Sequence, residues 1–126
     1  MKPLNGCRVL VVEDQPIIAL SITDILNGLG AIIVGPSATV EGALRFVESD
    51  PPDVALLDLW LGKEQVYPVC DALTASGIPF ALSSGSDVFA EGGKFRTAPR
   101  IYKPFHPDEL AAVLASLCCS NRSNHH

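Results

Sequence analysis

The stretch RVLVVED, residues 8–14, sets the frame for the whole chain. Four consecutive apolar residues, three of them valine, stand directly before two acids. A short, unbroken apolar run is typical of a strand that is buried on both faces of a parallel sheet. We therefore expect an α/β domain in which the two acids lie at the carboxyl end of this strand.

Four further apolar runs follow, and we expect each to form a strand: Ala31–Gly35, Val54–Asp58, Phe80–Ser83 and Arg100–Tyr102. Helical patterns alternate with them, at Pro16–Leu29, Val40–Val47, Val66–Ala75, Pro107–Leu117 and, shortened by Gly92-Gly93, Asp87–Phe95. Five alternations predict a single doubly wound (βα)5 domain, with a five-stranded parallel sheet and helices on both faces.

Composition limits the classes of protein to consider. The chain has 126 residues, 48% of them hydrophobic, which suits one compact domain. A net charge of −5 without a run of Lys or Arg argues against a nucleic-acid partner. We see neither a span of roughly 20 apolar residues nor a signal peptide, so we expect a cytoplasmic protein with no membrane partner.

The end of the chain differs from the rest. We place the folded domain at residues 1–119 and expect residues 120–126, which are small and polar, to form a disordered tail. The final His125-His126 has the composition of an expression-tag remnant.

The four cysteines are Cys7, Cys70, Cys118 and Cys119. Their spacing matches neither a metal site nor a disulfide framework, and free thiols are the default in a reducing compartment. We expect Cys118-Cys119 to be the end of a helix rather than a redox site.

Polar groups follow four of the predicted strands. Glu13-Asp14 follow the first strand, Asp58 ends the third, Ser84 follows the fourth and Lys103 follows the fifth. Like charges gathered at one edge raise one another's pKa unless a positive charge joins them. A hard divalent cation with oxygen ligands would supply that charge, with Lys103 as a fixed one.

Each of these residues also has an ordinary structural interpretation. Asp14 could cap the first helix, and Lys103 could be a surface lysine. The functional interpretation is favoured because acids, a hydroxyl and an amine all fall at the same edge of the predicted sheet.

At this point the sequence resembles the receiver domains of two-component response regulators, from about Arg8 to Leu117. The motifs are Glu13-Asp14 after the first apolar run, Asp58 within LLDL, Ser84-Gly85 and Lys103-Pro104-Phe105. The resemblance implies a flavodoxin-like fold and a phosphoacceptor switch, which takes a phosphoryl group from a histidine kinase and is not an enzyme in its own right.

The resemblance also implies a role for each motif residue. Asp58 would be the phosphoacceptor, and Asp14, Asp58 and the backbone carbonyl of Trp60 would hold Mg²⁺ or Mn²⁺. Glu13 would reach the metal through water. Ser84 would donate a hydrogen bond to the phosphoryl group, and Lys103 would pair with it. A metal and a lysine beside one carboxylate suit phosphoryl transfer, which depends on positioning and charge.

One departure from the family pattern and one resemblance to a subgroup bear on switching and on partners. Receivers usually carry Tyr or Phe three residues before the conserved lysine, and here that position is Arg100. The segments PFALSSG, residues 79–85, and VYPV, residues 66–69, resemble a subgroup partnered by HWE-type histidine kinases. We expect such a kinase and a downstream protein or phosphotransfer partner, with the domain a monomer or a weak homodimer.

Three alternatives belong to other functional classes. A haloacid-dehalogenase-type phosphatase would need a second Asp two residues after Asp58, where Trp60 stands. A flavodoxin-like FMN binder would need a phosphate loop at residues 13–16, where the two acids repel phosphate. The third alternative is a receiver-like interaction module with impaired switching, which Arg100 keeps open.

Overall fold

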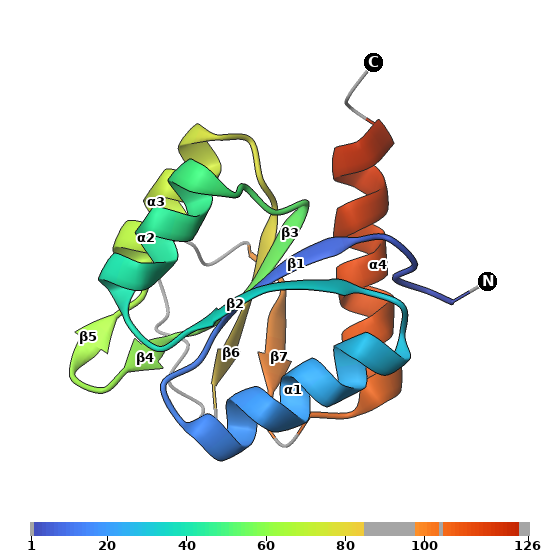
Figure 1. Cartoon of the computed structure of the whole chain (residues 1–126), viewed down its shortest axis with the longest axis horizontal. Helices are drawn as coiled ribbons and strands as arrows, with labels where there is room; N and C mark the ends of the chain where they lie inside the picture. Colours follow the sequence, from blue (N-terminus) through green and yellow to red (C-terminus); the bar gives the residue numbers. More distant parts are fainter. Residues whose placement is uncertain (1, 85–97, 104, 124–126) are drawn as a thin grey trace.

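A computed structural model of the chain describes residues 2–84, 98–103 and 105–123, as a central sheet between two layers of helices (Figure 1). The main sheet contains β1 (Arg8–Val12), β2 (Ile32–Ser37), β3 (Val54–Asp58), β6 (Phe80–Ser84) and β7 (Arg100–Tyr102). The helices are α1 (Pro16–Gly28), α2 (Val40–Ser49), α3 (Tyr67–Ala75) and α4 (Pro107–Ser123).

The strands lie side by side in the order β2-β1-β3-β6-β7, and every neighbouring pair is parallel. The chain adds β2 on one side of β1 and then returns to add β3 on the other, so the strand order reverses between β1 and β3. In open α/β sheets, ligand-binding groups gather beyond the carboxyl ends of the strands at such a reversal. The predicted doubly wound fold is confirmed, and the reversal lies where Glu13 and Asp58 stand.

The bounds of β1, β3 and β7 are those predicted, but β2 differs. It begins at Ile32 and continues to Ser37, beyond the predicted end at Gly35. Its register against β1 shifts between Leu10 and Val12, after which Val12 pairs with Ser37. Gly35 has a φ of +94°, and a Cβ there would lie 2.9 Å from the backbone nitrogen of Ser37. Glycine therefore lets the strand bend and resume its pairing.

Each strand divides its side chains between the two faces, as the two-residue period of a strand requires. Val9 and Val11 of β1 pack in a core shared with α1 and α4, while Leu10 and Val12 pack in a core shared with α2 and α3. All four side chains are buried. This explains why the strand is an unbroken apolar run, since neither face meets water.

The helix boundaries follow local chemistry. Thr39 caps α2, because its side-chain oxygen accepts a hydrogen bond from the backbone N–H of Gly42 at 3.0 Å. Helix α4 continues to Ser123, so residues 120–123 are helical where the sequence predicted a disordered tail. Residues 108–123 contain neither Gly nor Pro that would end the helix. The predicted helix Asp87–Phe95 lies outside the described residues. Within the described ranges, every helix is too short or too polar to span a bilayer.

A small hairpin after β3 was not predicted. Its strands are β4 (Trp60–Leu61) and β5 (Glu64–Gln65), paired antiparallel. Gly62 and Lys63 form the turn, and Gly62 has a φ of +64° while Lys63 does not have a positive φ. That combination is typical of a type II′ turn, which suits a two-residue hairpin. The hairpin lies next to the carboxyl end of β3, beside the predicted site.

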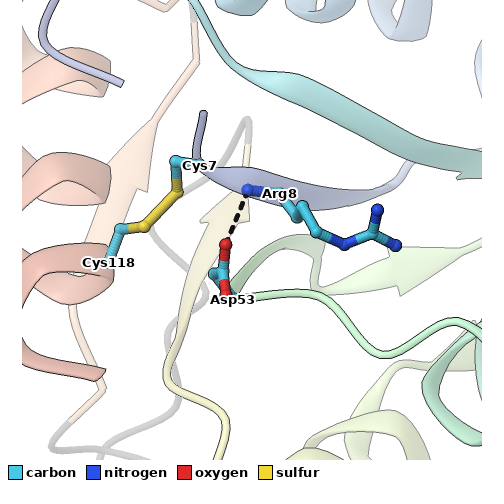
Figure 2. Close-up of a disulfide and its surroundings, with 4 residues drawn as sticks. All are labelled: Cys7, Arg8, Asp53 and Cys118. Atoms are coloured by element: carbon cyan, nitrogen blue, oxygen red, sulfur yellow. Dashed lines mark hydrogen bonds between the residues drawn. A yellow bond between two sulfur atoms is a disulfide. The ribbon is translucent and has the colours of Figure 1, made fainter. Parts of the chain in front are cut away.

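The expectation of four free thiols is wrong for two of the cysteines. Cys7, just before β1, and Cys118 of α4 form a disulfide, with their Cα atoms 6.5 Å apart (Figure 2). Cys70 is a free, buried thiol. The two bonded cysteines are 111 residues apart in sequence, and they meet because α4 packs against the core that contains Cys7, Val9 and Val11. Spacing along the chain gives no sign of such a pair.

Candidate functional site

The predicted site residues come from the carboxyl ends of three strands of the sheet. Glu13 and Asp14 directly follow β1, Asp58 is the last residue of β3, and Lys103 directly follows β7. These strands are parallel and joined through the sheet, so their ends share one edge. The structure thus brings together the residues that the sequence placed at one edge.

Lys103 links the two buried acids. Its Nζ donates hydrogen bonds to Oε1 of Glu13 at 2.7 Å and to Oδ2 of Asp58 at 3.3 Å. Glu13 is 2% exposed and Asp58 is 7% exposed, while the Lys103 side chain is 16% exposed. Lys103 is therefore not an ordinary surface lysine. Its amine is held largely out of water against two carboxylates, and breaking such a pair leaves a buried charge without a partner.

Asp14 contacts the hairpin instead. Its Oδ2 accepts a hydrogen bond from the backbone N–H of Gly62 at 2.8 Å. The N-terminal cap position of α1 is occupied by Gln15, so the alternative in which Asp14 caps that helix is not observed. Among the described residues, the ion pairs of Lys103 involve Glu13 and Asp58, and Asp14 is not a partner.

Burial and charge shift the pKa values of two of these groups. Burial raises the pKa of Glu13, although the hydrogen bond from Lys103 opposes it, and the nearby charge of Asp58 adds to the rise. Burial lowers the pKa of Lys103, but the hydrogen bond to Glu13 and the charges of Asp58 and Glu13 outweigh it, so its pKa is raised overall. The amine therefore stays protonated, whereas the acids repel one another.

The three acids fit a divalent cation. Glu13, Asp14 and Asp58 each offer a carboxylate oxygen, and these three oxygens all lie within 4.8 Å of one another. A hard cation such as Mg²⁺ prefers oxygen ligands of this kind and retains several waters. Three carboxylates facing one amine leave negative charge in excess, which a cation would balance.

The backbone of Trp60 is oriented away from its hairpin partner. The N–H of Val66 donates to the carbonyl of Leu59 at 3.0 Å, which makes Leu59–Val66 a hydrogen-bonded pair. Antiparallel pairs alternate, so the next pair, Trp60–Gln65, does not use its peptide groups within the hairpin. The N–H of Trp60 instead lies 3.4 Å from Oδ1 of Asp58. On this pairing pattern the carbonyl of Trp60 takes no part in the hairpin ladder.

Two other predicted residues lie in the outer strands. Ser84 ends β6, where its backbone pairs with Tyr102, and its side chain is outside the described residues. Arg100 begins β7, pairs in register with Leu82 and is half-buried.

Sequence reasoning missed Gly62, which supplies the backbone N–H that holds Asp14. The signal in the sequence was weak. A single glycine between Leu61 and Lys63 is compatible with a two-residue hairpin turn, but the flanking strands have only two residues each. Such strands are too short to show an alternating pattern.

Comparison with known proteins agrees with this geometry. A family model described as the response regulator receiver domain matches residues 9–115. The chain belongs to this family, so it is a receiver domain, the phosphoacceptor switch of a two-component response regulator. The match to this family also argues against the alternative that the chain is a haloacid-dehalogenase-type phosphatase.

Individual relatives show the same class. The Phyllosphere-induced regulator PhyR of Methylorubrum extorquens is 30% identical over 112 residues, which cover 86% of this chain and 42% of that protein. The solution structure of SdrG from Sphingomonas melonis Fr1 has a TM-score of 0.78 and 41% identity, covering 93% of this chain and 98% of that one. The anti-anti-sigma factor PhyR from Bartonella quintana has a TM-score of 0.80 and 25% identity, covering 94% of this chain and 49% of that one. The chain spans about half the length of the curated relatives it matches.

Proposed function

We propose that Asp58 is the phosphoacceptor of this receiver domain. The observation that carries the proposal is the position of its carboxylate, 3.3 Å from the Lys103 amine and next to Glu13 and Asp14. A phosphohistidine nitrogen–phosphorus bond would break as a bond forms between phosphorus and an oxygen of Asp58. Lys103 would then pair with a phosphoryl oxygen, and Ser84 would donate a hydrogen bond to another.

The same acids would hold the metal ion. Asp14, Asp58 and the carbonyl of Trp60 would bind Mg²⁺ or Mn²⁺ directly, and Glu13 would do so through water. The mutual distances of the carboxylate oxygens support this set. When bound, the cation would offset the charge of the carboxylates and of the transferred phosphoryl group. Lys103 and the Gly62 N–H then serve to orient Asp58 and Asp14.

The phosphoryl donor in the cell would be a histidine kinase, which membership of the receiver family supports. The residues at 66–69 and 79–85 favour a kinase of the HWE type. The output would pass to a second protein by contact or by onward phosphotransfer.

The test is intact mass spectrometry after incubation with acetyl phosphate and Mg²⁺. We expect wild type to gain one phosphoryl group and Asp58→Asn to gain none. Asp24→Asn is the matched control. Asp24 is exposed on α1, so this substitution removes the same charge at a position away from the site. Equal phosphorylation of Asp58→Asn and wild type would overturn the assignment, as would an equal loss in Asp24→Asn.

A further inference from the structure

The disulfide joins two segments that also meet at the functional site. Cys7 directly precedes β1, and Glu13 follows the end of the same strand. Lys103 precedes α4, and Cys118 lies near the end of that helix. Glu13 and Lys103 are paired at 2.7 Å. The two segments are thus joined by a disulfide at one end and by an ion pair at the other.

The sulfur end of this arrangement is packed inside the protein. Cys7 is 1% exposed and Cys118 is 3% exposed, and both belong to the core that α4 shares with the sheet. Leu110, Leu114 and Cys118 follow one another at four-residue spacing along α4, so the bond continues the buried stripe of the helix.

We propose that Cys7 and Cys118 form a thiol–disulfide switch that fastens helix α4 to the start of β1, with a small-molecule disulfide such as glutathione disulfide as the oxidant. The inference does not depend on the assignment of Asp58 as phosphoacceptor. It concerns a second kind of signal, the thiol redox state, acting on the helix that follows Lys103.

The chemistry balances as two exchange steps. The thiolate of one cysteine attacks a sulfur of the small-molecule disulfide, which forms a mixed disulfide and releases one small thiol. The second cysteine then attacks the protein sulfur of that mixed disulfide, which closes the Cys7–Cys118 bond and releases the second small thiol. Two protein thiols are oxidised and one small-molecule disulfide is reduced, and the two protein protons pass through solvent to the two small thiols that are released.

The surroundings make the exchange slow while α4 is packed. The Asp53 carboxylate lies within 4.8 Å of both sulfurs, and its Oδ2 accepts the backbone N–H of Arg8 at 2.9 Å (Figure 2). A neighbouring carboxylate disfavours the thiolate that must attack. Together with burial, this ties exchange to opening of the helix end, so the bond is made or broken when α4 lifts from the sheet.

The first test identifies the bond. The chain is reduced, freed of reductant in the presence of EDTA, incubated with glutathione disulfide and alkylated, and its peptides are then mapped by mass. We expect a linked pair of peptides carrying Cys7 and Cys118, with Cys70 alkylated only after unfolding. The linked pair is expected in Cys119→Ser and Cys70→Ser, and it is expected to be lost in Cys118→Ser. Two unlinked thiols at positions 7 and 118 in oxidised wild type would overturn the proposal.

The second test measures what the bond does to the helix. Hydrogen exchange is compared in oxidised and reduced wild type, which needs no substitution that could unfold the protein. We expect amides at residues 110–118 to exchange at least tenfold more slowly in the oxidised form, and the amides of α2 to change much less. In Cys118→Ser, glutathione disulfide is expected to have no effect on exchange. Equal exchange of residues 110–118 in the two forms of wild type would refute the switch even if the bond forms.

Discussion

At the scale of single residues, the site is defined by an imbalance of charge. Three carboxylates have oxygens within 4.8 Å of one another, and the Lys103 amine contacts two of them. Lys103 forms ion pairs with Glu13 and Asp58, while Asp14 accepts a hydrogen bond from the backbone N–H of Gly62. Asp14 is therefore the acid whose negative charge is least compensated by the described contacts.

This imbalance predicts a stabilising substitution. In EDTA near pH 7, Asp14→Asn should raise the melting temperature by an amount corresponding to about 1 kcal/mol, because it removes repulsion and keeps an oxygen for the Gly62 N–H. Thermal unfolding followed by circular dichroism measures this. Added Mg²⁺ should stabilise the variant less than wild type, by mass action.

Two comparisons make the result specific. Asp58→Asn should raise the melting temperature in EDTA less than Asp14→Asn does, because it also loses the charged contact with Lys103. Asp24→Asn should change the melting temperature little. If Asp14→Asn melts below wild type in EDTA while Mg²⁺ raises both equally, the acids do not act as one site.

A second prediction separates the two positive charges that the site would use. Lys103→Ala should still bind Mg²⁺ but lose most of its phosphorylation by acetyl phosphate, because the amine serves the phosphoryl group and the acids serve the metal. Trp60 is the single tryptophan and lies next to Asp58, so its fluorescence can report metal binding. Loss of the Mg²⁺-dependent fluorescence change in Lys103→Ala would show that these roles are wrongly divided.

The remaining described thiol gives a prediction about pH. Burial raises the pKa of Cys70 from 9.0 to about 12, and the charge of Asp71 adds to this. The unfolded chain loses this proton near pH 9 while the folded protein keeps it, so the free energy of unfolding falls as pH rises from about 9 toward 12. Between pH 8 and 10.5 the Cys70 contribution should be on the order of 2 kcal/mol.

Urea denaturation at the two pH values checks this. Cys70→Ala will be less stable than wild type at both, because it leaves a cavity. The informative quantity is the difference between the pH values, which should be smaller in Cys70→Ala. An identical loss in both proteins would mean that the Cys70 thiol ionises as easily in the folded protein as in the unfolded chain.

At the scale of secondary-structure elements, the start of α2 is unusually crowded. A Cβ on Gly42 would lie 2.6 Å from Oγ of Ser37 and 3.1 Å from Oγ1 of Thr39, the residue that caps the helix. Glycine at this position therefore serves close packing between β2 and α2. This matters for the site, because the carbonyl of Ser37 accepts the backbone N–H of Glu13 at 2.9 Å.

We predict that Gly42→Ala destabilises the protein by roughly 1–3 kcal/mol, as overpacking does. The sign is opposite to the usual effect of replacing glycine by alanine within a helix. Chemical denaturation measures the change. The double variant Ser37→Ala/Gly42→Ala should be less destabilised than the sum of the two single variants, because it removes the crowded oxygen. A stabilised Gly42→Ala would show that Ser37 rotates away without cost.

Long, buried elements could be predicted from the sequence, and short ones could not. Strands β1 and β3 are apolar on both faces, so their pattern is independent of context, and their bounds were correct. The hairpin at Trp60–Gln65 has two residues in each strand, and its position depends on the tertiary contact between Gly62 and Asp14. Likewise β2 passes through Gly35-Pro36, which are usually signals of a turn, because pairing with β1 resumes at Ser37.

For the candidate site, the positions of the residues could be predicted from the sequence, but their hydrogen-bond partners could not. The positions of Glu13, Asp58 and Lys103 follow from strand ends in a parallel sheet, and the structure confirms that they meet. The hydrogen-bond partner of each acid could not be predicted from the sequence, because it depends on side-chain geometry rather than on strand order. The bond between Cys7 and Cys118 is the extreme case, since its two residues are nearly at opposite ends of the sequence.

At the scale of the whole molecule, two cores lie on either side of one sheet. Helices α1 and α4 share a core with the side chains of Val9 and Val11, and α2 and α3 share the other. The site lies at the carboxyl edge of this sheet, between β1 and β3, and the disulfide lies at the start of β1. The two features are therefore separated by the length of a strand, and the disulfide joins α4 to the sheet at the end away from the site.

The bond between Cys7 and Cys118 also has a mechanical consequence. Pulling on the residues outside positions 7 and 118 loads the sulfur–sulfur bond, because the 111 peptide units between them form a closed covalent ring. Tension cannot reach the strands or helices inside that ring while the bond is intact. In a single-molecule stretching experiment the oxidised domain should release almost no length, whereas the reduced domain should lengthen on the order of 380 Å at about 3.4 Å per residue, less its folded end-to-end distance. Full extension of the oxidised form would mean that the ring is not closed, and the redox state would then determine nothing about how this domain bears a load.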